Sequence, residues 1–136
     1  MIVLLDTQCW LWMNEAPERF SGDARRLIES RETSLLLSSA SAWEIAIKYG
    51  LGKLRLPVSP AEYVPSRLQP TRTAPLPISH EHALRTAELP PHHRDPFDRL
   101  LVAQAQIERL PVLTADAQFE AYDVDVIWAL PRAVIS

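Results

Sequence analysis

The sequence lacks the features that mark several common classes of protein. Cys9 is its only cysteine, which rules out an internal disulfide and agrees with a reducing cytoplasm. The first residues, MIVLLDTQCWLW, contain no basic segment and carry an acid at position 6, so we expect neither a signal peptide nor a membrane span. These absences predict a soluble, cytoplasmic protein that does not associate with membranes.

Motifs of several enzyme classes are also missing. The sequence has no Walker A pattern and no GxGxxG, so nothing predicts a bound nucleotide. It has no Gly-x-Ser-x-Gly turn, which argues against a Ser-His-Asp hydrolase. The histidine spacing matches no zinc site, and we expect these side chains to face solvent or phosphate: His80, His82, His92 and His93.

What is present is an unbroken alternation of short apolar runs and amphipathic segments. With 136 residues, 47% of them hydrophobic, the chain has the size of one domain with a buried core. Strands are predicted at residues 2–5, 34–38, 111–114 and 124–128, with a short edge segment at 74–78 that holds two prolines. Helices are predicted at 7–14, from Ser21, from Ser41 to Gly50, at 60–68, at 79–89 and at 95–107. This order predicts a single α/β domain over residues 1–136, a three-layer α/β/α sandwich around a mainly parallel sheet.

The stretch from His92 to Gln106 is the best-defined helix start. Asp95 occupies an N-cap position, Pro96 the first helical position and Asp98 the first turn. Taken alone, Asp98 in such a place is more typical of a helix start than of a metal ligand.

Four acids are predicted to meet at one rim of the sheet. Asp6 and Asp116 follow strands, Glu44 lies early in the helix after the second strand, and Asp98 can turn toward the same rim. Carboxylates gathered in this way repel one another unless cations bind or some stay protonated. Oxygen ligands suit Mg²⁺ or Mn²⁺, and such ions can activate water and stabilise the leaving oxygen of a phosphodiester.

Each acid also has a structural alternative. Glu44 stands three residues after Ser41, which is the spacing of a capping box, and Asp116 can begin a turn before Phe119. Thr7 and Thr114 have hydroxyls that either bond around the ions or close local turns. The tryptophans lie in apolar runs, which favours a core or interface role over base stacking: Trp10, Trp12, Trp43 and Trp128.

The charge pattern fits an anionic partner only when the acids are neutralised. The formal net charge is −3, from 14 basic and 17 acidic residues, which argues against an ordinary nucleic-acid binder. With four acids neutralised by cations, 14 basic residues face 13 acidic ones and the balance becomes +1. Five basic residues between positions 48 and 72 are then the candidate strip for binding the RNA backbone: Lys48, Lys53, Arg55, Arg67 and Arg72.

Four segments, in this order and spacing, resemble the PIN-domain ribonucleases of the VapC toxin group: LLDTQCWLW, SSASAWEIAIKYGLGKL, HRDPFDRLLVAQA and VLTAD. The resemblance runs over nearly the whole chain and is weakest from Pro57 to Pro77. It implies that the metal-binding and catalytic acids are Asp6, Glu44, Asp98 and Asp116, while Asp95 matches a common family residue outside that set.

The resemblance also implies an activity and partners. It implies an endoribonuclease toxin that depends on Mg²⁺ or Mn²⁺, forms a homodimer and is inhibited by a cognate antitoxin, which in this family often inserts a basic or apolar side chain into the acidic pocket. The candidate RNA-binding residues are Lys48, Lys53, Arg55, Arg94 and Arg99, although the two last can instead pair with nearby acids. Two other functions remain open: a PIN-fold binding module with little turnover, and a phosphatase with Asp6 as nucleophile. The phosphatase is disfavoured because Gln8 stands where its second aspartate would be.

Overall fold

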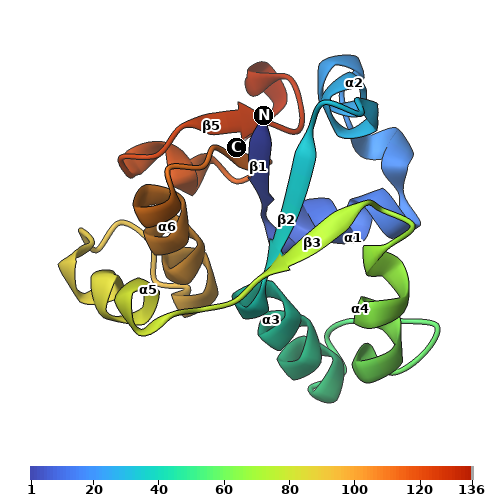
Figure 1. Ribbon diagram of the computed structural model, residues 1–136, viewed down its shortest axis with the longest axis horizontal. Helices are drawn as coiled ribbons and strands as arrows, with labels where there is room; N and C mark the ends of the chain where they lie inside the picture. The colour runs from blue at the N-terminus through green and yellow to red at the C-terminus, as the bar shows by residue number, and fades with distance from the viewer. Residues whose placement is uncertain (136) are drawn as a thin grey trace.

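A computed structural model describes residues 1–135 and contains a five-stranded sheet, shown in Figure 1. The strands are β1 (Ile2–Leu5), β2 (Ser34–Ser38), β3 (Thr73–Leu76), β4 (Val112–Thr114) and β5 (Val126–Trp128). Their order is β3-β2-β1-β4-β5, and every neighbouring pair is parallel. The predicted α/β architecture with a mainly parallel sheet is therefore confirmed.

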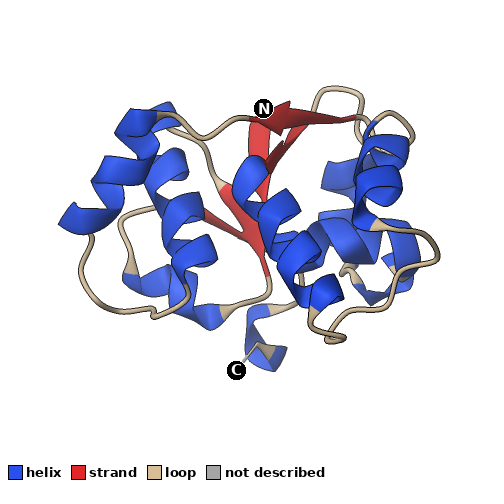
Figure 2. Cartoon of the chain, turned by 90° about the horizontal axis from the view of Figure 1, so that it is seen from below, coloured by secondary structure: helices blue, strands red, loops and turns tan. Residues whose placement is uncertain are grey.

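Helices lie on both sides of the strands (Figure 2). They are α1 (Thr7–Glu15), α2 (Gly22–Glu29), α3 (Ser39–Gly50), α4 (Pro60–Leu68), α5 (His80–Arg85) and α6 (Pro96–Glu108). Short 3-10 turns complete the chain: η1 (Pro17–Arg19), η2 (Thr86–Glu88), η3 (Ala117–Ala121) and η4 (Arg132–Val134). Within the part of the chain that the structure describes, no helix combines the length and the apolar character needed to cross a membrane.

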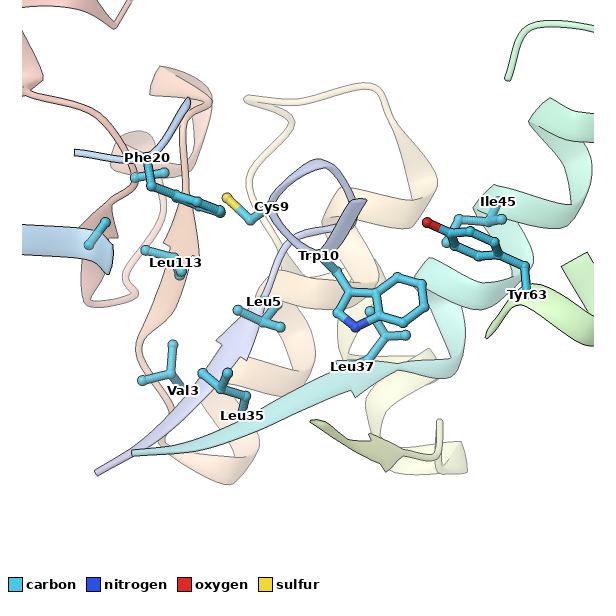
Figure 3. Close-up of a cluster of buried hydrophobic side chains, with 12 residues drawn as sticks. Val3, Leu5, Cys9, Trp10, Phe20, Leu35, Leu37, Ile45, Tyr63 and Leu113 are labelled. Atoms are coloured by element: carbon cyan, nitrogen blue, oxygen red, sulfur yellow. The ribbon is translucent and has the colours of Figure 1, made fainter. Parts of the chain in front are cut away.

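The apolar strands feed two separate cores, because successive side chains point to opposite faces of the sheet. Val3 and Leu5 of β1 pack with Cys9 and Trp10 of α1 on one face, where α2, α3 and α4 also contribute (Figure 3). Leu4 packs on the other face, in a cluster supplied mainly by α6 and η3. Both faces are covered, which explains why these strands read as continuous apolar runs rather than as alternating ones.

The strand order defines a topological crevice beyond the carboxyl ends of β1 and β4. The chain moves from β1 outward to β2 and β3, and then returns to the other side of β1 for β4 and β5. The order reverses between β1 and β4, and ligands of such sheets bind beyond the carboxyl ends of the strands at this point. Asp6 directly follows β1, and Asp116 comes two residues after β4.

Helix α3 begins earlier than its sequence pattern predicts. Its N-cap is Ser38, whose side chain accepts a hydrogen bond from the Ala40 N–H, so the predicted capping box of Ser41 and Glu44 is wrong. The reason is that β2 passes into α3 without a loop, and the extended backbone of Ser38 already suits an N-cap. Ser41 and Glu44 consequently lie inside the helix.

Other local predictions agree with the structure. Asp95 caps α6, Ser79 caps α5, and the proline-bearing β3 lies at an edge of the sheet. The helix from Ser79 is shorter than predicted, because α5 ends at Arg85 and a 3-10 turn follows it. Trp10 is fully buried, but Trp43 is 57% exposed and lies edge-on against Phe97.

Tyr63 provides a test of the packing between α4 and α1. It is fully buried, and its hydroxyl donates to the Glu15 carboxylate. Burial first, and then the Glu15 hydrogen bond and charge, raise the pKa of Tyr63 to about 12, against an opposing effect of Arg67. The neutral phenol is therefore favoured in the folded state, and this stabilisation is complete below the unfolded pKa near 10 and is lost as the pH rises through about 12.

We predict that Tyr63→Phe removes part of the alkaline loss of stability. Between pH 9 and pH 12, the free energy of unfolding of the wild-type protein should fall by roughly 1–2 kcal/mol more than that of the variant. Urea unfolding at several pH values measures this difference. Tyr49→Phe, at an exposed tyrosine, is the matched control; equal pH slopes for all three proteins would contradict the prediction.

Candidate functional site

Asp6 is held at the junction of β1 and α1. It is only 6% exposed, and it caps α1 by accepting a hydrogen bond from the Cys9 N–H at 2.7 Å. Its second carboxylate oxygen accepts from the Thr114 hydroxyl at the end of β4. Burial raises the pKa of Asp6, and these hydrogen bonds offset part of that rise.

Glu44 is held by partners from two helices. It is 5% exposed, and its two oxygens accept from the Thr7 hydroxyl at 2.6 Å and from the Lys48 ammonium at 2.5 Å. The Thr7 hydroxyl also lies 2.8 Å from that of Ser41, so the start of α1 is tied to α3. Thr7 therefore bonds across the site rather than closing a local turn. The same carboxylate raises the pKa of Lys48.

Asp98 and Asp116 approach from the other side of the crevice. Asp95 accepts from the Phe97 N–H, and Pro96 follows, so that α6 presents Asp98 in its first turn. Asp116 caps η3 by accepting from the Gln118 N–H at 2.9 Å, and its own N–H donates to the Thr114 hydroxyl at 2.9 Å. One hydroxyl thus joins Asp6 to the backbone of Asp116.

Hydrogen bonds and close contacts link the four predicted acids at one end of the sheet. Thr114 joins Asp6 to Asp116, and His93 lies between Asp98 and Asp116. Glu44 bonds Thr7, which follows Asp6. The pKa of Asp98 is raised to about 8, first by burial and then by the charges of Asp95, Asp6, Glu44 and Asp116. All three of the other predicted acids are therefore near enough to act on Asp98. The structure brings the set together as the sheet topology predicts, and their roles in catalysis and metal binding stay a prediction.

His93 belongs to this site although the sequence pattern predicts a histidine facing solvent or phosphate. Its Nε2 atom lies 2.9 Å from Asp98 Oδ2 and 3.3 Å from Asp116 Oδ2. The expectation is wrong for His93 because a local turn, in which the Asp95 N–H donates to Nδ1, directs the ring inward. The signal in the sequence that could have placed His93 in the site is its position two residues before Asp95, the N-cap of α6. The expectation is also wrong for His82, which is buried and bonds Ser79 and Glu108.

The candidate RNA-binding residues lie in different surroundings. Lys48 and Lys53 line a small cavity of about 140 Å³ that also borders Thr7 and Glu44. Arg55 and Arg94 are exposed.

Arg99 has neither of the two roles predicted from the sequence, which were binding phosphate and pairing with nearby acids. Its guanidinium donates to the carbonyl oxygens of Thr86, Leu89 and Pro90, so it braces the loop before α6 instead of pairing with acids or remaining open to phosphate.

The donor set fits a hard divalent cation. Asp98 and Asp116 each offer a carboxylate oxygen, and these two atoms and His93 Nε2 lie within 4.8 Å of one another. The rest of the predicted set is carboxylate oxygen, which Mg²⁺ and Mn²⁺ prefer to softer ligands. The buried acids Asp6 and Glu44 supply negative charge that a cation would balance.

Comparison with known proteins supports one family. Residues 3–125 match the family model described as PIN domain. The ribonuclease VapC16 of Mycobacterium tuberculosis is 48% identical over 60 residues, a match that spans 44% of this chain and 43% of that relative. The aligned part is thus less than half of the relative's length.

Solved structures share the fold at low sequence identity. A chain of VapBC2 from Rickettsia felis, bound to a DNA fragment from its promoter, has a TM-score of 0.69 at 18% identity, with 94% of this chain and 98% of that chain covered. DNA-bound VapBC from Salmonella typhimurium has a TM-score of 0.65 at 18% identity, with the same coverage. FitAcB from Neisseria gonorrhoeae has a TM-score of 0.59 at 24% identity over 92% of this chain and 96% of that chain. These values confirm the expected PIN-like fold.

We predict that Thr114→Val weakens the link between Asp6 and Asp116. The buried Asp6 carboxylate loses a donor and the Asp116 N–H loses an acceptor, so the free energy of unfolding should fall by about 1–3 kcal/mol. Urea denaturation measures the change. Thr33→Val, at a buried threonine just before the amino end of β2, is the control, and a Thr114→Val protein as stable as wild type would refute the expectation.

Proposed function

Since this chain belongs to the PIN-domain family, we propose that it is a metal-dependent endoribonuclease of the VapC toxin type, formed by a single domain over residues 1–136. The observation that supports the proposal is that four acids from distant segments are linked by hydrogen bonds and close contacts at the point where the strand order reverses. The relative named as a ribonuclease supports the same reaction class.

The metal would be held by carboxylates of Asp6, Glu44, Asp98 and Asp116. The chemistry supplied when Mg²⁺ or Mn²⁺ is bound is polarisation of the phosphodiester and activation of an attacking water. The surrounding residues keep the acids in place: Thr114 and the Cys9 N–H orient Asp6, while Thr7 orients Glu44. No nucleophilic side chain is required, which separates this proposal from the Asp6 phosphatase.

The RNA backbone would approach across the exposed basic residues. Lys53 and Lys48 border the cavity beside Glu44, and Arg55 and Arg94 complete the proposed path. Arg99 is not part of this path, because its guanidinium already donates hydrogen bonds to backbone carbonyls. Neutralising the acids with cations removes the net repulsion of RNA, as the charge balance of +1 indicates.

An antitoxin and a second copy of the chain complete the proposal. Chains of similar fold come from VapBC and FitAcB assemblies, which supports a small protein partner. An acidic pocket of this kind attracts a cationic side chain, which would compensate its charge and block phosphate. The proposed toxin is a homodimer in the cytoplasm, which is where its RNA substrate is found.

We predict metal-dependent RNA cleavage that requires Asp98. Purified protein should cut RNA with Mg²⁺ or Mn²⁺, and EDTA should stop the cleavage. The Asp98→Asn variant should cut at least about 100-fold more slowly, which is the size of loss seen when one group that stabilises transition-state charge is removed. Asp23→Asn, at an exposed aspartate of α2, should cut at the wild-type rate.

Two results would count against this. Equal cutting by Asp98→Asn excludes catalysis at the acidic site. Tight RNA binding without cleavage, unchanged by EDTA and by Asp98→Asn, supports the binding module instead.

We predict that Lys53→Ala combined with Arg55→Ala weakens RNA binding through lost phosphate contacts. Affinity for single-stranded RNA, measured by fluorescence anisotropy, should fall for all sequences alike, and the slope of log K against log salt should decrease by about 1.4. Arg25→Ala with Arg26→Ala on α2 removes the same charge elsewhere and should have a smaller effect on this slope. Identical slopes for both double variants would show that the proposed path is wrong.

A further inference from the structure

We infer that His93 is a positioning residue, which holds the Asp98 and Asp116 carboxylates for a cation without becoming a ligand itself. The inference deepens the proposed function and rests on it. It concerns a residue outside the four acids, and it is carried by the hydrogen bonds of the imidazole ring.

The ring of His93 is anchored from several sides. Its Nδ1 atom accepts a hydrogen bond from the Asp95 N–H at 3.1 Å, and its backbone N–H donates to the Tyr122 hydroxyl at 2.8 Å. The ring meets Phe119 edge-on, with centroids 6.4 Å apart. Only 11% of the side chain is exposed. These contacts therefore fix the position of Nε2 between the two carboxylates.

The anchoring bond decides which nitrogen carries the proton. An N–H points at Nδ1, so Nδ1 is an acceptor and the ring proton lies on Nε2. A histidine that binds a metal through one nitrogen usually donates a hydrogen bond from the other, to a carboxylate or a carbonyl. His93 has the opposite arrangement, because its Nδ1 faces a donor. A protonated Nε2 has no free lone pair to offer a cation.

The Nε2–H group instead joins two elements of the site. It donates to Asp116 Oδ2 at 3.3 Å, and Asp98 Oδ2 lies 2.9 Å from the same nitrogen. Asp98 belongs to the first turn of α6 and Asp116 to the turn after β4, so a single N–H spans the crevice. Each carboxylate keeps further lone pairs for a cation. Loss of this donor removes the contact that the two carboxyl groups share.

The test uses Mn²⁺ as the probe and compares three variants with the wild type. His93→Phe keeps an aromatic ring but removes the donor, and its Mn²⁺ affinity by calorimetry should fall about tenfold or more. His93→Gln places an amide N–H near the position of Nε2 and should stay within about threefold of wild type. His92→Phe, at the exposed neighbour that packs on Tyr122, should bind as wild type does.

A spectroscopic readout separates positioning from ligation. Electron spin echo measurements on the Mn²⁺-loaded wild-type protein should show no coupling from a directly coordinated imidazole nitrogen. Such a coupling would overturn the inference, as would wild-type Mn²⁺ affinity in His93→Phe or a tenfold loss in His93→Gln. If His93→Phe does not fold by circular dichroism, the wild-type spectrum and His93→Gln still decide.

Failure of this inference is distinguishable from failure of the proposed function. If the wild-type protein binds Mn²⁺ and cuts RNA but His93 proves to be a ligand or without effect, only the inference fails. If the wild-type protein neither binds Mn²⁺ nor cuts RNA, the proposed function fails and the inference is overturned with it.

Discussion

Repulsion among carboxylates at one end of the sheet is the constraint that the surrounding structure accommodates. A buried carboxylate is costly unless hydrogen bonds or opposite charge compensate it. Asp6 and Glu44 are almost fully buried, and each of their oxygens accepts from a defined donor. Asp98 has less compensation, and its pKa is raised first by burial and then by the charges of the neighbouring acids. The crevice thus gathers carboxylate oxygens from four segments of the chain, and such oxygens are the ligands that hard divalent cations prefer.

The fold brings these acids together through long-range contacts. Asp6 and Thr114 are 108 residues apart in the sequence, yet their strands β1 and β4 are neighbours in the sheet. Thr7 reaches Glu44 in the same way, from the start of α1 to α3. Site geometry and folding are therefore coupled, because the hydroxyls that orient the acids also connect the elements of the domain. A change at Thr114 acts on both together.

Local sequence patterns predict most elements because their causes are local. The Asp95–Pro96 pair begins α6, and apolar runs mark the strands, because caps and side-chain alternation depend on near neighbours. The proximity of Asp6 and Asp116 was also predictable, since the carboxyl ends of parallel strands share an edge, whereas the patterns around Glu44 and Asp98 favoured helix starts. The start of α3 was not, because Ser38 and Ser41 are equally good caps in sequence. The contacts of His93 and Arg99 were not predictable from the sequence, because their partners lie on other turns and loops.

The acids are held by two kinds of donor, and the difference matters for metal binding. Backbone N–H groups and the Thr7 and Thr114 hydroxyls are fixed by the fold, so they set the direction of each carboxylate without supplying charge. Lys48 is different, because its side chain is 47% exposed and it contributes a full positive charge to Glu44. Lys48 lies on the solvent side of this pair, whereas the Glu44 side chain is 6% exposed and its charge is costly without a positive partner. A cation that replaced this ammonium would keep Glu44 neutralised, while the fixed donors stayed in place and Lys48 became available to phosphate at the edge of the same cavity.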